Sequence, residues 1–204
     1  MKLLYPTLGA LAILAVFTFI VGRQSRDLLR VRAYREFLWR MLPSLSTGVF
    51  VAGLPFVMAL ATVDNYAPVL IVYLGGAAVL TLLMARAVDP EERRAGTAFR
   101  RGEYDKAAEI YEALVEYRPL PRYYSALGAS LDAGGDPHGA LEATDRAVKM
   151  DPKLGIAYYN RASARVALGR TAPARGDLQK VFQTDSSRAL RRAAEQALET
   201  LEKV

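Results

Sequence analysis

Three long apolar stretches in the first half of the chain limit its fold more than any other feature. Residues 3–21 and 44–63 carry no charged side chain, and residues 67–88 carry only Arg86. With a rise of about 1.5 Å per residue, helices of this length cross the roughly 30 Å hydrocarbon core of a bilayer. The sequence therefore predicts a membrane domain of residues 1–88 with three membrane-spanning helices at about these positions.

The first apolar stretch has one alternative interpretation, a signal peptide that is cleaved. Lys2 is the only basic residue before the stretch, and Arg23 and Arg26 follow it where a small-residue cleavage site would be needed. We therefore favour an uncleaved span. The middle of each stretch lacks acidic and basic residues, which argues against a transporter, a proton relay or a channel.

Arginines predict the orientation of these spans. The segment after the third span holds Arg86, Arg93 and Arg94. The loop after the first span is richer still, with Arg23, Arg26, Arg30, Arg32, Arg35 and Arg40. With three spans, both segments fall on the same side, which the positive-inside rule makes cytoplasmic. The prediction is a multi-pass protein of the cytoplasmic (inner) membrane, with its N-terminus outside and residues 89–204 inside.

The loop between the first two spans predicts an amphipathic helix of about residues 26–42. Leu28, Val31, Leu38 and Leu42 recur at helical spacing, and arginines occupy much of the rest. Such a helix can lie in the membrane interface with its guanidinium groups on lipid phosphates. A plain connecting helix whose arginines only set the topology is an equal alternative. The residues expected at the interface are Arg23, Arg26, Arg30, Trp39, Arg40 and Arg86.

Residue types exclude several kinds of chemistry. The chain has no cysteine and a single histidine, His138, so thiolate ligands and a Cys nucleophile are absent, and zinc or haem ligation is not expected. The net charge of +6 comes mostly from residues 1–88, because residues 89–204 hold 19 basic and 18 acidic groups. The basic face that nucleic-acid binding requires is therefore missing. We predict no catalytic residue, no metal site and no cofactor.

The second half of the chain repeats itself. Three segments of equal length, beginning at Gly102, Gly135 and Gly169, align without gaps, and these glycines are 33 and 34 residues apart. A glycine at this place permits a tight turn after a helix. One pair of short helices cannot bury its apolar face alone, so stacking of successive pairs is expected to supply the core.

These repeats resemble the tetratricopeptide-repeat family, which stacks two antiparallel helices about every 34 residues. The second repeat matches the family signature best, with Tyr124, Leu127-Gly128, Leu131, Ala140, Ala147 and Pro152. The third repeat departs at Ser186, which replaces the closing proline, and the first departs at Glu91, which replaces the opening aromatic. The resemblance implies an all-α fold, with an α-solenoid of three helix pairs in a domain of residues 89–204. The repeats would span about 88–120, 121–154 and 155–188, and a capping helix would span 187–203.

Family members hold a segment of a partner protein on the concave face formed by the first helix of each repeat. The resemblance maps this groove onto Asp89, Glu92, Phe99, Arg122, Ser125, Asp132, Ile156, Tyr159, Asn160, Ser163 and Val166. Members that clamp the terminal carboxylate of a chaperone use paired Lys, Asn and Arg side chains. Only Asn160 matches such a clamp here, and Glu92 stands where a lysine is needed, so this class of partner is not favoured.

Together these features predict a membrane-anchored scaffold or adaptor without enzymatic activity, which recruits or assembles partner proteins through the groove. Its expected contacts are protein partners and the lipid bilayer, with transmembrane helices of other subunits as a further contact. The alternative is a structural accessory subunit of a larger membrane protein complex.

Overall fold

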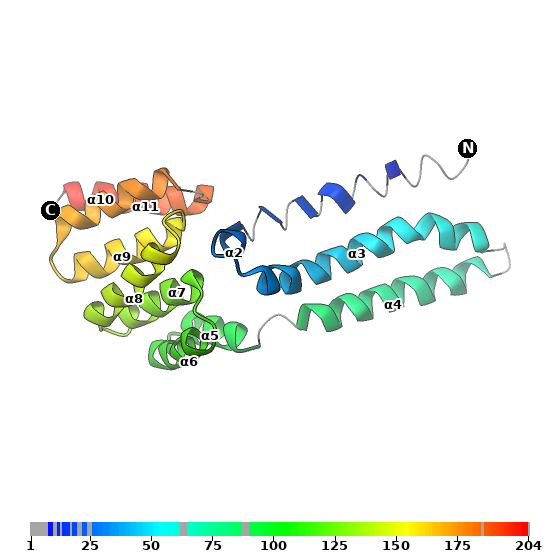
Figure 1. Ribbon diagram of the computed structural model, residues 1–204, viewed down its shortest axis with the longest axis horizontal. Coiled ribbons are helices and arrows are strands. Elements are labelled where there is room, and N and C mark those ends of the chain that lie inside the picture. The colour runs from blue at the N-terminus through cyan, green and yellow to red at the C-terminus, as the bar shows by residue number, and fades with distance from the viewer. Residues whose placement is uncertain are drawn as a thin grey trace. The chain divides into compact units, whose positions relative to one another are not determined.

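The computed structural model describes residues 26–61, 65–86, 90–184 and 186–203, together with residues 8–9, 12, 14–16, 18–19 and 22–23. The chain divides into two compact units, residues 1–89 and 90–204. In the part of the chain just given, all regular structure is helical. Helices α2–α4 belong to the first unit and α5–α11 to the second (Figure 1).

The first unit contains α2 (Arg26–Arg30), α3 (Tyr34–Leu60) and α4 (Tyr66–Arg86). Two helices within the described ranges, α3 and α4, are long and apolar enough to cross a membrane, rather than the three that the sequence predicts. The predicted span at residues 3–21 lies mostly outside the described residues. The expected spans at 44–63 and 67–88 fall on the second part of α3 and on α4, respectively.

The structure divides the predicted helix of residues 26–42 differently. The short helix α2 ends in a turn in which Arg32 has a positive φ of 58°. The amide of Ala33 donates to the carbonyl of Leu28 (2.8 Å), and the amide of Arg32 donates to that of Leu29 (3.2 Å). These two bonds form a Schellman motif, which ends a helix by satisfying its last carbonyls. The following residues then join the apolar stretch in one helix of 27 residues.

Two prolines lie inside α3 without ending it. Pro43 and Pro55 each remove one backbone donor, and Pro55 leaves the carbonyl of Val51 without its helical partner. In lipid such groups must be satisfied by protein atoms. One residue earlier, the carbonyl of Phe50 accepts a hydrogen bond of 2.8 Å from the hydroxyl of Tyr73 on α4. A side chain of the neighbouring helix therefore supplies a polar contact close to the proline.

The helices α3 and α4 pack side by side as a hairpin (Figure 1). The hydroxyls of Thr47 and Thr81 lie 3.4 Å apart and share a hydrogen bond. The absence of a side chain at Gly53 makes room for Tyr73, because a methyl group there would come within 2.5 Å of the Tyr73 hydroxyl. Between the two helices lies an open groove of about 530 Å³, lined by Thr47, Phe50, Val51, Leu54, Tyr73, Leu74, Ala77, Ala78, Thr81 and Leu82.

The absence of native cysteine permits a direct test of this hairpin. We expect the double variant Thr47→Cys/Thr81→Cys to form an intramolecular disulfide under mild oxidation, because the two hydroxyl oxygens lie 3.4 Å apart. Protection from alkylation, read by mass spectrometry, measures the reaction. Thr47→Cys/Val79→Cys is the matched control, since Val79 is 58% exposed on α4 and has turned away from Thr47. Equal protection of both pairs would contradict the hairpin.

The second unit is a stack of helix pairs. The first helices of the pairs are α5 (Pro90–Arg100), α7 (Pro121–Ala133) and α9 (Gly155–Ala167), and the second helices are α6 (Tyr104–Tyr117), α8 (Pro137–Met150) and α10 (Thr171–Phe182). A last helix, α11 (Arg188–Glu202), packs on α10 and caps the stack. Its Ala194 is fully buried in a core cluster with Tyr158, Leu178 and Val181. The expected pairs and capping helix are therefore present.

Glycines end each first helix in the same way. Gly102, Gly135 and Gly169 have φ values of 79°, 91° and 71°, which is the left-handed region that glycine enters at little cost. Behind each of them a 6→1 backbone hydrogen bond closes the turn, with lengths of 3.0, 2.8 and 2.7 Å. The prediction of a tight glycine turn in each repeat is confirmed.

Two alanine substitutions separate backbone strain from loss of glycine flexibility. Gly135→Ala is expected to destabilise the second unit by about 1–2 kcal/mol, because a residue with a Cβ is strained in the left-handed region. Gly176→Ala is the control, since Gly176 lies within α10 with open space around it, and is expected to be neutral or stabilising by up to about 1 kcal/mol. Urea unfolding of the two variants measures the difference, and equal effects would contradict the turn geometry.

A glycine inside a helix serves close packing instead. A Cβ at Gly128 on α7 would lie 3.0 Å from the carbonyl oxygen of Ala140 and closer still to the side chain of Thr144, both on α8. Thr144 is buried and donates its hydroxyl hydrogen bond to the Ala140 carbonyl (2.7 Å). The helices of the second repeat therefore meet backbone to backbone at the Leu127-Gly128 motif.

Candidate partner-binding surface

The residues predicted to line the groove lie on the three first helices. Glu92 and Phe99 belong to α5, Arg122, Ser125 and Asp132 belong to α7, and Ile156, Tyr159, Asn160, Ser163 and Val166 belong to α9. Their spacing of three, four and seven residues keeps each set on one side of its helix. We call these residues the first-helix face. Asp89 lies outside the described residues.

Polar side chains of the first-helix face bond across repeats, to one another or, for Glu92, to the buried Tyr123 of α7. Three contacts link consecutive first helices: the Tyr123 hydroxyl donates to Glu92 Oε2 (3.0 Å), the Asn160 amide donates to the Ser125 carbonyl (3.0 Å) and hydroxyl (3.1 Å), and the Ser163 hydroxyl donates to Asp132 Oδ2 (2.5 Å). Each contact joins residues 31 or 35 positions apart, which is about one repeat. These side chains therefore fix the stacking of α5, α7 and α9.

Asn160 in particular has a structural role. Its amide bonds to Ser125, whose side chain is only 1% exposed. Both residues are therefore engaged in the packing of α7 on α9. Asn160 therefore matches a carboxylate clamp in residue type only, because its amide nitrogen already donates hydrogen bonds within the stack.

Apolar side chains make up much of what remains open on α9. Ile156 is 39% exposed and Val166 is 41% exposed, near the two ends of the helix. Tyr159 is half-buried and packs against the core cluster around Tyr158 and Ala162. The surface that α9 offers to a partner is therefore apolar at both ends, with the exposed Ser163 between them.

Aromatic rings connect the first repeat to the second. The rings of Tyr111 and Tyr123 lie 6.5 Å apart, and the guanidinium of Arg118 lies 6.0 Å from the ring of Tyr123. Burial raises the pKa of Tyr111, and the charge of Glu92 raises it further, against a smaller lowering by Arg100. Within the first repeat, the ring of Phe99 on α5 makes an edge contact with the ring of Tyr104 on α6, with the two centroids 5.4 Å apart.

Sequence reasoning missed a network of ion pairs that joins the second and third repeats. Arg161 donates two hydrogen bonds to the carboxylate of Asp177 (2.6 and 2.9 Å) and one to Asp145 (2.8 Å), and Arg165 donates one to Asp177 (2.6 Å). The side chain of Asp177 is only 4% exposed. Burial alone would lower the pKa of Arg161, but the bonds and charges of Asp177 and Asp145 outweigh it and raise that pKa. The network ties α8, α9 and α10 together.

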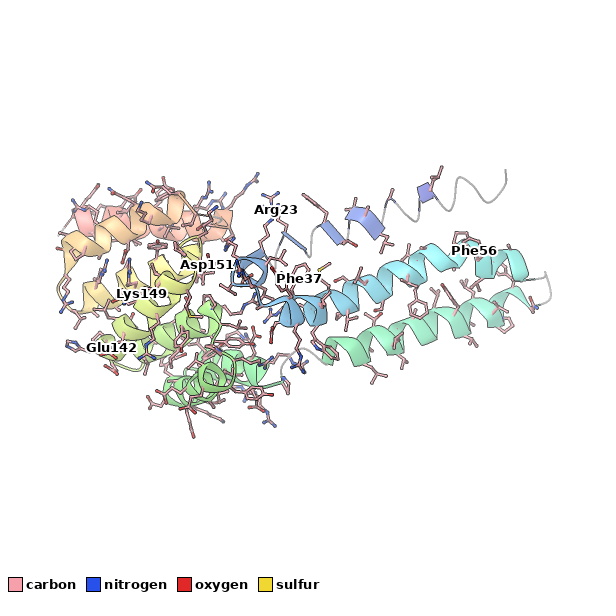
Figure 2. All side chains as sticks on the ribbon, viewed as in Figure 1. Arg23, Phe37, Phe56, Glu142, Lys149 and Asp151 are labelled. Atoms are coloured by element: carbon pink, nitrogen blue, oxygen red, sulfur yellow. The ribbon has the colours of Figure 1, made fainter. Side chains whose placement is uncertain are left out.

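The residues expected at a membrane interface belong to the first unit. Arg23, labelled in Figure 2, and Arg26 are exposed, and Trp39 is 52% exposed near the start of α3. Arg30 and Arg40 are half-buried and each has a partner. The side chain of Arg86 lies outside the described residues.

The described residues contain no group of three or more His, Asp or Glu side chains that could hold a metal ion. His138 is exposed in the first turn of α8. A single exposed histidine in a helical turn is not by itself a catalytic site.

Comparison with known proteins relates the second unit to one repeat family. Residues 93–120 match the family model of the tetratricopeptide repeat. The mitochondrial import receptor subunit TOM70 of Saccharomyces cerevisiae is 34% identical over 80 residues, which are 39% of this chain and 13% of the receptor. The TPR repeat-containing thioredoxin TTL4 of Arabidopsis thaliana is 32% identical over 126 residues, 60% of this chain and 18% of TTL4. The matches thus cover a small part of each relative.

Solved structures share the fold. The translocator chaperone SycD of the Yersinia enterocolitica type III secretion system superposes with a TM-score of 0.52 at 20% identity, covering 60% of this chain and 91% of SycD. The TPR2AB domain of yeast Sti1, solved as a complex with pHSP90, superposes with a TM-score of 0.50 at 14% identity, covering 93% of this chain and 85% of that one. At these identities the likeness concerns the arrangement of helices alone.

Proposed function

We propose that this chain, whose residues 90–204 form a tetratricopeptide-repeat module, is a membrane-anchored scaffold that recruits or assembles partner proteins. The observation that carries the recruiting role is the pair of exposed apolar residues on the first-helix face of α9, Ile156 and Val166. Polar residues of the same face are engaged in stacking, and these two are its exposed apolar side chains. The module acts by binding, without chemistry of its own.

The anchoring role is supported by the outward surfaces of α3 and α4. In the apolar windows of these helices only 11% and 0% of the residues are buried. A core helix of a soluble protein would have its apolar surface covered, whereas Ile71 and Val72 are 70% and 74% exposed and Val49 is 63% exposed. Lipid chains are the surroundings that suit such side chains. On α3, Phe56 in Figure 2 is a further large apolar residue on the outer surface, at 57% exposure.

The orientation follows from the arginines. Residues 23–40 and 86–94 are rich in arginine, and the positive-inside rule favours placing both segments on the cytoplasmic side. In this arrangement the N-terminus is outside, and the repeat module is in the cytoplasm at the inner membrane. Three spans are needed to bring both arginine-rich segments to the same side, so this arrangement includes a span at residues 3–21.

The partner that this surface favours presents apolar side chains. Sti1 was solved with pHSP90, and TOM70 is an import receptor subunit, so related modules are built for capturing proteins. In the present chain, Glu92 and Asn160 lie where the carboxylate clamp would need free cationic and amide groups. We therefore expect an amphipathic or extended apolar segment as the ligand, rather than an acidic chain terminus.

A second candidate function is that of a structural subunit in a larger membrane complex. The open groove between α3 and α4 favours it, because Ala77 and Ala78 line the groove and a Cβ at Gly75 or Gly76 would meet nothing within 4 Å. Small residues on an open helix surface allow another transmembrane helix to approach closely. In this case the chain would be present in a fixed ratio to its partners.

Affinity capture from detergent, with chemical crosslinking, tests the proposed function. We expect Ile156→Asp/Val166→Asp to reduce the captured partner by about tenfold or more, since burying two unpaired carboxylates in an apolar contact is costly. Thermal melting should stay near that of the wild type, because both side chains are exposed. The control is Glu109→Lys/Glu142→Lys, two exposed changes on second helices, which should capture normally. Capture unchanged by the aspartates would refute this binding surface.

The amount of captured protein separates the two candidates. A fixed stoichiometric ratio that survives Ile156→Asp/Val166→Asp favours the structural subunit. Substoichiometric capture that is lost in this variant favours the scaffold. Tyr159 is less suited to this experiment because its packing against the core cluster couples its replacement to stability.

A further inference from the structure

Resting on the proposed membrane anchoring, we propose that one edge of the repeat module is a lipid-binding surface that lies on the anionic membrane beside the anchor. The edge consists of the N-terminal ends of α5, α7, α9 and α11 and the C-terminal ends of α6, α8 and α10. We call it the entry edge, because the chain enters the module at Pro90, the first residue of α5, with only residues 87–89 between α4 and α5.

The topology of the stack brings these helix ends together. Consecutive helices are joined by short turns, such as residues 101–103, 134–136 and 168–170, and therefore run antiparallel. All first helices consequently begin, and all second helices end, on the same side of the module. Figure 2 labels Lys149 and Asp151 at the end of α8 that belongs to the entry edge, and Glu142 toward the other end of the same helix.

Exposed apolar side chains concentrate on the entry edge. The described residues of the module include five exposed large apolar side chains: Tyr117, Met150, Ile156, Val166 and Phe182. Three of them, Tyr117, Met150 and Phe182, are the last residues of α6, α8 and α10 and lie at the entry edge, whereas Ile156 lies at the same end but belongs to the first-helix face proposed for a protein partner. Tyr117, at 81% exposed, is the most open of the five. Only Val166 lies at the opposite edge.

The same edge is basic. Its exposed cationic side chains are Arg93, Arg94, Lys149, Lys153, Lys180, Arg188, Arg191 and Arg192. Its acidic ones are the exposed Glu116 and, in the first turn of α5, Glu91 and Glu92. The opposite edge has no such excess. There Asp105, Asp136, Glu142, Glu199 and Glu202 are exposed together with Arg100, Arg101, Lys106, Arg170, Arg175 and Lys203. The entry edge is thus net positive and the opposite edge nearly neutral, although the module as a whole has almost equal numbers of basic and acidic residues.

Aromatic and apolar side chains among basic ones are the combination that binds a membrane interface. Tyrosine rings settle at headgroup level, and lysine and arginine are attracted to anionic lipids of the cytoplasmic leaflet. Arg118 adds to this pattern, since its guanidinium lies 5.7 Å from the ring of Tyr117. A protein partner could use apolar contacts alone, whereas the coincidence of these contacts with a basic excess and with the point of chain entry favours lipid.

Single cysteines in the full chain test the proposal, because no native cysteine competes for the label. Two matched pairs place one probe at each end of a helix: Tyr117→Cys and Lys106→Cys on α6, and Met150→Cys and His138→Cys on α8. Each variant carries a fluorophore and is reconstituted in nanodiscs that contain phosphatidylserine and a headgroup-nitroxide lipid. We expect several-fold stronger quenching at 117 and 150 than at 106 and 138.

Charge is tested separately from proximity. Lys149→Glu/Lys153→Glu/Lys180→Glu, combined with Tyr117→Cys, should lose most of the quenching at 117, as should replacement of phosphatidylserine by phosphatidylcholine. Strong quenching that is equal at both ends of each helix, or no quenching at 117 and 150, would overturn the proposal. Quenching at 117 that appears only when a captured protein is removed would assign this edge to a protein instead.

This design distinguishes the inference from the proposed function. Failure of the full chain to enter nanodiscs would refute the membrane anchor itself. Entry into nanodiscs with unquenched probes would leave the anchor intact and refute only the lipid-binding edge.

Discussion

Asp177→Ala is expected to destabilise the repeat module by about 3–5 kcal/mol, because it removes the common partner of two partly buried cations. Arg161 and Arg165 have side chains only 14% and 20% exposed, and both donate to the carboxylate of Asp177. The pairing of Arg161 with Asp177 is bidentate, which is a strong geometry for a guanidinium and a carboxylate. Without the carboxylate, water can reach neither cation fully.

Urea unfolding of residues 90–204, followed by circular dichroism, measures this loss. The control is Asp145→Ala, because the side chain of Asp145 is 39% exposed and its ion pair is with Arg161, so that its removal should cost about 1 kcal/mol or less. Adding Arg161→Met to Asp177→Ala should recover part of the lost stability, since it removes one cation left without its partner. Equal effects of the two aspartate substitutions would show that the network does not act through burial.

Val72→Asp/Val79→Asp is expected to prevent integration of the chain into membranes. The two valines are 74% and 58% exposed on the outer surface of α4, toward the middle of the helix. A carboxylate at mid-bilayer depth opposes insertion by about 2.5–3.5 kcal/mol, so the pair opposes it by roughly twice as much. The fraction of chain that resists alkaline extraction from membranes should fall to a minor part.

Position along the helix provides the control for this variant. Tyr66→Asp/Leu83→Asp introduces the same charges at 50% and 58% exposed positions near the two ends of α4. There the carboxylates can reach the headgroups, so most of the chain should remain membrane-integrated. Loss of integration in both variants would mean that charge alone, rather than charge at bilayer depth, accounts for the result.

The repeat architecture could be read from the sequence because the signals are local. Gly102, Gly135 and Gly169 mark turns that only glycine forms easily, and the structure gives all three a positive φ. Gly128 fits the place where α7 approaches the backbone of α8. Such signals depend on residues a few positions apart, which periodicity detects.

The membrane half was harder to divide. Proline at position 43 suggests a boundary between two helices, yet α3 runs through it. The actual break follows α2 at Arg32, which adopts the left-handed conformation although it is neither glycine nor asparagine, the residues that usually mark such a turn in a sequence. A Schellman turn at a residue of this type depends on the packing of its neighbours, such as the fully buried Leu28, and this packing is not visible in the sequence.

The candidate site depends on contacts between repeats, and these limited its prediction. Residue type and position on a helix identify the first-helix face. Whether Ser125 is open to a partner or bonded within the stack, however, depends on Asn160, which is 35 positions away. The role of Asp177 was missed for the same reason, because Arg161 and Arg165 resemble solvated charges until α9 and α10 are packed. A spacing of four between two arginines, with an aspartate in the next helix, is the signal that could have found the network.

Flotation of reconstituted vesicles after alkaline carbonate extraction tests the central claim most directly. The full chain should rise with the lipid, because the exposed apolar surfaces of α3 and α4 are suited to the bilayer core. Residues 90–204 should remain in the aqueous fraction while keeping a helical circular dichroism spectrum. A full chain that stays in the aqueous fraction without detergent would contradict the account.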